Sequence, residues 1–88
     1  MLNQFVVVGR LKEILNERDI IIVVNNLEKN KDGEYTNEEL TIETGTTLMK
    51  NVEEYCKPGD ILGIKGKIKH PNKLVAEKIS FLSNRKEV

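Results

Sequence analysis

An all-β domain with one short helix is the fold class that this sequence predicts. Three observations favour it: runs rich in β-branched residues recur along the chain, turn residues separate them, and one stretch with helical spacing lies between the third run and the fourth. The chain has 88 residues, of which 39% are hydrophobic and 32% are charged. We expect one domain with a thin core over residues 1–83, followed by a frayed tail at 84–88.

The first two predicted strands are apolar. Residues 5–8 (FVVV) are almost entirely β-branched, and Gly9 directly after them is typical of a bulge or a sharp bend in a strand. Residues 19–25 (DIIIVVN) are apolar on both faces. The second strand is therefore expected at the centre of the sheet.

A hairpin and a third strand follow. Residues 28–39 are polar and contain Asp32-Gly33, a strong signal for a two-residue hairpin turn. Residues 40–44 (LTIET) alternate between apolar and polar side chains, which predicts the third strand.

A short helix is predicted for about residues 47–56. Its apolar residues form one stripe at helical spacing, made of Leu48, Val52 and either Tyr55 or Cys56. Thr46 or Thr47 can cap the N-terminus of this helix. Pro58-Gly59 ends it, in the positions that a type II turn requires.

The last two predicted strands form a hairpin around a turn at residues 70–72. Residues 61–69 (ILGIKGKIK) alternate cleanly. One face carries Leu62, Ile64 and Ile68, and the other carries Lys65, Lys67 and Lys69. Residues 73–82 form the final strand.

The resulting order is three strands, one helix and two strands. It is the order of the OB-fold, a five-stranded Greek-key barrel with one short helix between strands 3 and 4. In that barrel the first strand bends so that it pairs in both halves, and Gly9 lies where the bend is needed.

Charge is unevenly distributed along a chain whose net charge is zero. Residues 28–54 carry three basic groups against eight acidic groups, whereas residues 55–88 carry eight basic groups against three acidic groups. The basic C-terminal third favours a polyanionic partner.

Several function classes are not expected. The sequence has one cysteine, Cys56, and one histidine, His70, so we predict no disulfide, no zinc site, no nucleophilic catalysis and no cofactor. We likewise expect no small-molecule substrate. The longest apolar run, residues 20–24, is far shorter than the roughly 20 residues that span a bilayer, so we expect a cytoplasmic protein without a membrane partner.

Four segments, at residues 2–11, 51–61, 63–68 and 75–83, together resemble the bacterial and phage single-stranded-DNA-binding (SSB) proteins, in particular the short Gram-positive forms. The resemblance implies binding of single-stranded DNA with little sequence preference, in replication, recombination or repair. It also implies a homo-oligomer, tetramer or dimer, built by pairing of the first strand and packing of sheets. The implied location is the bacterial cytoplasm, at the nucleoid.

The chain departs from the family at its stacking aromatic residues. The aligned positions fall near Glu28 and near Glu39 or Leu40, and none of these residues is aromatic. This departure, together with the acidic middle segment, favours an alternative: an OB-fold protein-interaction module, such as a replication-complex subunit, with weak or no DNA binding. An RNA-binding OB-fold is also compatible with the sequence.

The candidate nucleic-acid-binding residues are lysines, one arginine and one tyrosine. Lys65, Lys67 and Lys69 share a strand face and are either a track for phosphates or a solvated outer face. Tyr35, beside the hairpin turn, either stacks on a base or packs across the hairpin. The basic residues that could extend the track are Arg10, Lys12, Lys31, Lys73 and Lys78.

Overall fold

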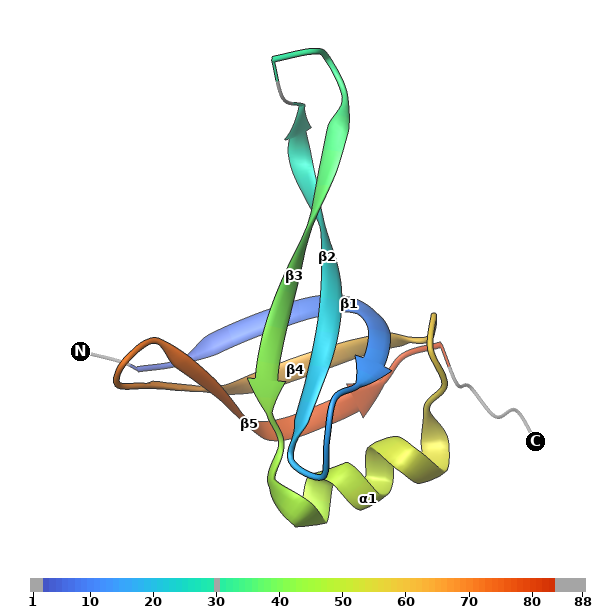
Figure 1. The fold of residues 1–88 in the computed structure, drawn as a ribbon, viewed down its shortest axis with the longest axis vertical. Helices are drawn as coiled ribbons and strands as arrows, with labels where there is room; N and C mark the ends of the chain where they lie inside the picture. The colour runs from blue at the N-terminus through green and yellow to red at the C-terminus, as the bar shows by residue number, and fades with distance from the viewer. Residues whose placement is uncertain (1–2, 30, 84–88) are drawn as a thin grey trace.

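The computed structural model describes residues 3–29 and 31–83, and within them the side chains of residues 3–25 and 31–83. Its elements, in chain order, are β1 Phe5–Ile14, β2 Asp19–Lys29, β3 Tyr35–Glu43, α1 Gly45–Tyr55, β4 Ile61–Lys69 and β5 Lys73–Phe81 (Figure 1). The predicted tail at 84–88 lies outside the described residues.

The strands close into a barrel in the order β1-β2-β3-β5-β4, and β4 pairs back to β1. All neighbours are antiparallel except β3 and β5, which run parallel over a short stretch. α1 joins β3 to β4 across one end of the barrel (Figure 1). The barrel is an OB-fold. The predicted fold class is confirmed.

β1 pairs in both halves of the barrel, as predicted, and changes its partner strand at Arg10, directly after Gly9. Residues 5–10 pair with β4 and residues 10–14 pair with β2, so Arg10 belongs to both ladders. A Cβ atom at Gly9 would lie 2.5 Å from Ile22 Cγ2 and 2.5 Å from the Val23 carbonyl oxygen. The first strand can therefore pass this close to β2 only because residue 9 has no side chain.

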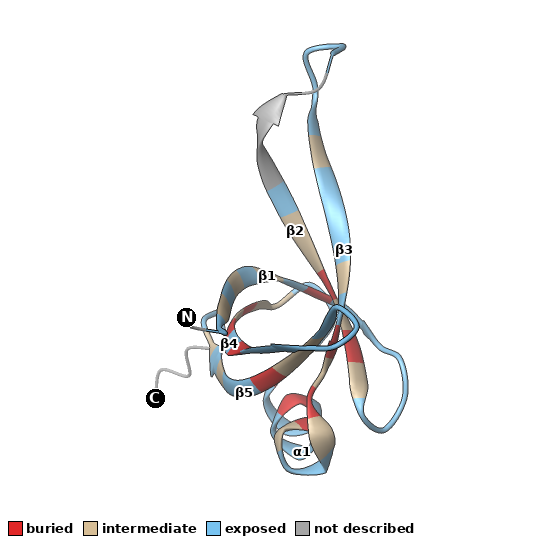
Figure 2. Ribbon diagram, turned by 90° about the vertical axis from the view of Figure 1, so that its left-hand side faces the viewer, coloured by how far each residue is buried: buried red, intermediate tan, exposed pale blue. Residues whose placement is uncertain are grey.

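The core fills the barrel and one face of α1, whereas the described side chains of the β2–β3 hairpin beyond it are mostly exposed (Figure 2). Apolar side chains from all five strands meet inside the barrel, and α1 adds Met49 and Val52 at its end. The buried members are Leu11, Ile20, Ile22, Ile42, Met49, Val52, Cys56, Leu62, Ile64 and Ala76. Ile68, predicted for this face, lies near the end of β4 and is 42% exposed.

The strands of the hairpin are longer than the sequence predicts. β2 continues to Lys29 and β3 begins at Tyr35, so that Asn25 pairs with Asn37 and Lys29 pairs with Tyr35. The turn lies at the predicted place, with Gly33 at φ +81°, but the last ladder pair before it is Lys29–Tyr35, so the connection is longer than two residues. We call the hairpin beyond the Asn25–Asn37 pair the arm. The two arms of a hairpin around Asp32-Gly33 were predicted, but the third strand was placed only from Leu40, because the polar residues before it give no hydrophobic alternation.

The predicted helix boundaries were wrong by one or two residues. α1 begins at Gly45, its N-cap is Thr44, and Thr46 and Thr47 lie inside the helix. The Thr44 hydroxyl makes no capping bond and instead donates to the Arg18 carbonyl at 3.1 Å. Packing against the β1–β2 loop thus determines where the helix starts.

Candidate nucleic-acid interface

The structure separates the predicted binding residues into three groups. Arg10 and Lys12 lie on β1, and Lys73 begins β5. Lys65, Lys67 and Lys69 lie together on β4. Lys31 and Tyr35 lie on the arm, which rises well clear of the barrel (Figure 1).

The first group lies beside acidic residues of β3. Lys12 Nζ lies 2.7 Å from Glu39 Oε2, and this hydrogen bond raises the pKa of Lys12. Lys73 Nζ lies 3.2 Å from Glu43 Oε1, and Arg18 Nη1 lies 4.0 Å from Glu43 Oε2. We call this surface the paired face, defined by Lys12, Arg18, Glu39, Glu43 and Lys73.

Arg10 is also engaged within the chain. Its Nη1 donates to the Gly59 carbonyl at 2.9 Å. Backbone bonds join the same two segments, because Leu11 N donates to Asp60 O at 2.9 Å and Gly59 N donates to Leu11 O at 2.8 Å. Arg10 therefore helps to attach the turn after α1 to β1.

The three lysines of β4 form the second group, which we call the lysine stripe. Lys65, Lys67 and Lys69 are exposed, while Leu62, Ile64 and Gly66 between and before them are buried. The predicted alternation of β4 is thus confirmed. Among the side chains that the structure describes, no carboxylate lies within ion-pair distance of these lysines. Their positive charge is therefore available to a ligand.

A register shift in β5 adds a fourth lysine to this surface. Lys69 pairs with Lys73 at the turn, but further along Lys65 pairs with Lys78 because Glu77 is an extra residue in the ladder. Lys78 was predicted only as a residue that could extend the track. Its position opposite Lys65 could not be predicted, because it depends on this register shift.

The arm carries the candidate stacking residue. Tyr35 is 65% exposed and Lys31 is exposed. The aligned family positions are occupied differently: Glu39 pairs with Lys12, and Leu40 packs partly buried against the core. The side chain of Glu28 lies outside the described ones. Tyr55, interpreted as structural, packs on Phe81 with ring centroids 5.7 Å apart.

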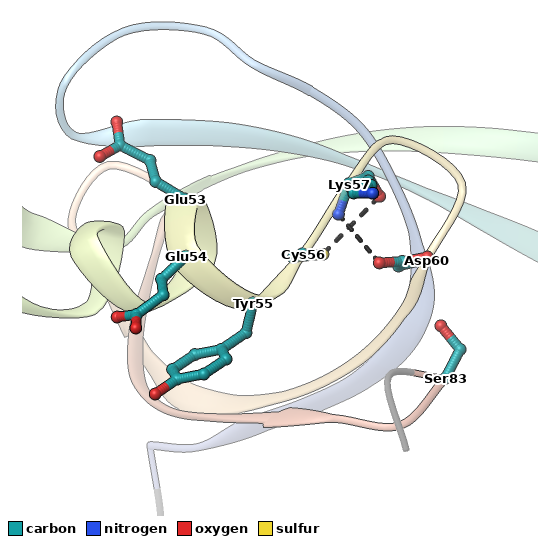
Figure 3. A pocket seen from close by; sticks show the side chains of 7 residues that line it. All are labelled: Glu53, Glu54, Tyr55, Cys56, Lys57, Asp60 and Ser83. Atoms are coloured by element: carbon teal, nitrogen blue, oxygen red, sulfur yellow. Dashed lines mark hydrogen bonds between the residues drawn. The ribbon is translucent and has the colours of Figure 1, made fainter. Parts of the chain in front are cut away.

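A hollow of about 410 Å³ lies where α1 ends (Figure 3). The carboxylates of Glu53 and Glu54 lie apart from that of Asp60, which accepts from the Lys57 amide at 2.9 Å (Figure 3). Cys56 is buried, and burial raises the pKa of its thiol to about 11. Its acidic lining makes this hollow a poor site for a polyanion.

Two further observations concern the described part of the chain. It contains no group of three or more His, Cys, Asp or Glu side chains that could hold a metal ion. It also contains no helix with the length and hydropathy needed to cross a membrane.

Solved structures share this architecture. The mitochondrial single-stranded DNA binding protein Rim1 of S. cerevisiae matches at TM-score 0.69 and 15% identity, over 99% of this chain and 100% of that chain. The Plasmodium falciparum SSB complex with ssDNA matches at TM-score 0.69 and 16% identity, over 93% and 96%. PriB from Ralstonia solanacearum matches at TM-score 0.63 and 12% identity, over 93% and 99%.

The likeness establishes the fold. No protein-family model matches the sequence, and the comparison with curated proteins finds no match either. The chain therefore shares the complete OB-fold of these proteins, at an identity too low to carry over individual residues.

Proposed function

We propose that this protein binds single-stranded DNA without sequence preference and without catalysis, and acts in replication, recombination or repair. The observation that carries the proposal is the lysine stripe, whose three exposed ammonium groups follow one strand of the barrel. Alternate residues of a strand are about 7 Å apart, so the stripe presents a regular row of positive charge. Such a row suits a flexible chain of phosphates.

The fold supports the same proposal. The similar structures include a protein described as single-stranded DNA binding and an SSB in complex with ssDNA. We propose the bacterial cytoplasm, at the nucleoid, as the location, in line with the resemblance to bacterial and phage SSB proteins.

Titration with fluorescent oligo(dT) at several salt concentrations tests the proposal. Each phosphate contact to a single strand contributes about 0.7 to the slope of log K against log salt. We expect saturable binding with a slope of about −2 to −3, which corresponds to three or four contacts. Oligo(rU) and a duplex of equal length serve as comparisons. Absence of binding to oligo(dT) at low salt would refute the proposal.

We also propose that the protein forms a homo-oligomer, at least a dimer. Within the described residues, residues 5–9 of β1 pair with β4 alone, so the other edge of this segment is unpaired. An unpaired strand edge is a template for the same strand of a second copy. Light scattering tests this, and a monomer mass of about 10.1 kDa at tens of micromolar would contradict it.

The second candidate function is that of a protein-interaction module. The paired face favours it, because Glu39 and Glu43 hold cations that a DNA strand would otherwise contact. The oligo(dT) titration distinguishes the two candidates, since the module predicts weak or no binding even at low salt.

A further inference from the structure

A hollow of about 300 Å³ opens on the outer face of β1, β4 and β5. Gly63 is part of its lining, together with the apolar side chains Val6 and Leu82 and the polar side chains Lys65, Lys78 and Ser80. Val6 is 72% exposed and Leu82 is 45% exposed. This surface therefore combines exposed apolar groups with two ammonium groups.

The strand register explains the arrangement. Lys65 pairs with Val6 on one side and with Lys78 on the other. In the next outward-facing row, Gly63 pairs with Val8 and with Ser80. The hollow thus exists because one residue in this row lacks a side chain, and a flat group can approach the strand backbone there.

Charge decides which occupant fits. Lys65 and Lys78 form a cross-strand pair of like charges, and the lysine stripe continues from them along β4. A second copy that packed its own identical face here would bring two lysine-rich surfaces together, and like-charge repulsion disfavours this. An anionic ligand with flat, largely apolar groups satisfies both the ammonium groups and the exposed Val6 and Leu82. A single nucleic-acid strand has this chemistry.

We propose that single-stranded DNA crosses the outer face of β4 and β5, with one base over Gly63 between Val6 and Leu82 and phosphates at Lys65 and Lys78. This inference rests on the proposed function and adds the path of the strand. The path avoids the paired face, where a phosphate would have to displace Glu39 from Lys12 or Glu43 from Lys73.

Filling the hollow tests the path. A Cβ atom at Gly63 would meet its nearest neighbour, Leu82 Cδ1, at 3.4 Å, an ordinary contact. Gly63 is also not among the glycines with positive φ. Gly63→Ala and Gly63→Val should therefore fold and occupy the hollow. Thr41→Ile adds bulk to an exposed position of β3 and is the matched control.

We expect Gly63→Val to weaken oligo(dT) binding about fivefold, because the added side chain excludes a base from the hollow. Lys65→Ala with Lys78→Ala should reduce the salt slope by about 1.4, or two phosphate contacts. Thr41→Ile should change neither quantity. Lys50→Ala with Lys57→Ala removes the same charge at the helix and the turn after it, and should leave the slope nearly unchanged.

The outcomes separate the two proposals. If the wild-type protein does not bind oligo(dT), the proposed function fails. If it binds, and the Gly63 and lysine variants bind equally well, the function stands and the path is overturned. The path is also overturned if Gly63→Val lowers the mass in light scattering but leaves DNA affinity unchanged, because a second copy then covers this face. Should Gly63→Val fail to fold, Gly63→Ala and the lysine pair give the answer.

Discussion

The paired face and the lysine stripe contain similar numbers of cationic side chains but differ in what those side chains touch. On the paired face, Glu39 and Glu43 lie 2.7 Å and 3.2 Å from Lys12 and Lys73. Along the stripe, none of the described carboxylates lies within ion-pair distance. The difference teaches that the charge available to a ligand depends on the register of acidic residues in neighbouring strands, and not on the number of lysines.

The two regions should therefore bind a phosphate differently. At the stripe, a phosphate displaces only solvent and counterions, and counterion release favours binding. At the paired face, the same phosphate competes with a carboxylate that is already in place, so that less binding free energy remains. The following predictions test this contrast, beginning with the largest expected effect.

Removing the stripe should have the largest effect. Replacing Lys65, Lys67 and Lys69 together with alanine should reduce the salt slope for oligo(dT) by about 2, since each lost contact contributes about 0.7. At low salt the affinity should fall by roughly two orders of magnitude. The control is Lys50→Ala with Lys57→Ala. An unchanged slope in the triple variant would mean that the strand binds elsewhere.

Tyr35 belongs to neither region, and its replacement indicates whether the strand also reaches the arm. Tyr35→Ala should reduce the binding free energy by about 1–3 kcal/mol if one base stacks there. Tyr35→Phe should retain most of the affinity, because stacking uses the ring. The chain has no tryptophan, so tyrosine emission reports the contact directly, with Tyr55 as the remaining signal. Equal affinity of the alanine variant and the parent would identify Tyr35 as a packing residue.

Removing the carboxylates of the paired face should reduce the difference in phosphate binding between this face and the lysine stripe. Glu39→Gln with Glu43→Gln removes both acidic partners and leaves Lys12, Lys73 and Arg18 available. We expect tighter binding of oligo(dT) and a slope steeper by up to about 2, or three phosphate contacts. Glu53→Gln with Glu54→Gln changes the net charge equally and is the control for long-range electrostatics. If the two double variants bind oligo(dT) with the same affinity and the same salt slope, the ion pairs do not weaken DNA binding at the paired face.

Cys56 should show the smallest response to DNA, because it lies in the core beneath α1, away from both regions. Its pKa of about 11, against an ordinary 9.0, predicts slow alkylation at pH 8 that accelerates as pH rises. Folding holds this proton more tightly than the unfolded chain does. The corresponding stabilisation is complete below pH 9 and is lost as pH rises toward 11.

Alkylation of Cys56 also serves as a folding control for every variant above. The rate in the native protein should be far below that in urea, and bound oligo(dT) should not alter it. Rapid labelling of the native wild-type protein at pH 8 would contradict the buried position of the thiol.

The elements that the sequence predicts best are those whose packing is visible in hydrophobic alternation. The bounds of β4, Ile61 to Lys69, were predicted correctly, because buried residues alternate with more exposed ones from Ile61 to Lys67; only Ile68, predicted for the buried face, is exposed. The pairing of β1 in both halves of the barrel was also predicted, from Gly9, where β1 passes too close to β2 for a side chain. The helical stripe was shifted: Met49, Val52 and Cys56 are the buried residues, and Leu48 is only partly buried.

The pairing of charges could not be predicted in the same way. Lys12 and Glu39 are 27 residues apart and meet across β2, so their contact depends on two ladder registers and on an irregularity in β1 between Leu11 and Glu13. Arg10, Lys12 and Lys73 were predicted as one group with the stripe. The sequence shows that these residues are basic, but it does not show which groups of other strands and turns they contact. The hollow at Gly63 depends on register in the same manner.

The extra residue in β5 has a consequence for how this barrel tolerates insertions and deletions. Counted regularly from the Lys69–Lys73 pair, Glu77 would stand opposite Lys65 and Ile79 opposite Gly63, in an outward row. The shift at Glu77 restores Ile79 to the row of Ile64 and places Lys78 opposite Lys65. One extra residue thus keeps Ile79 in a row that packs on the core and places a lysine, not a glutamate, on the outer face of the sheet. Deleting Glu77 would restore regular pairing with Lys78 still opposite Lys65 and Ile79 still opposite Ile64, so we expect the barrel to tolerate the loss of this one residue.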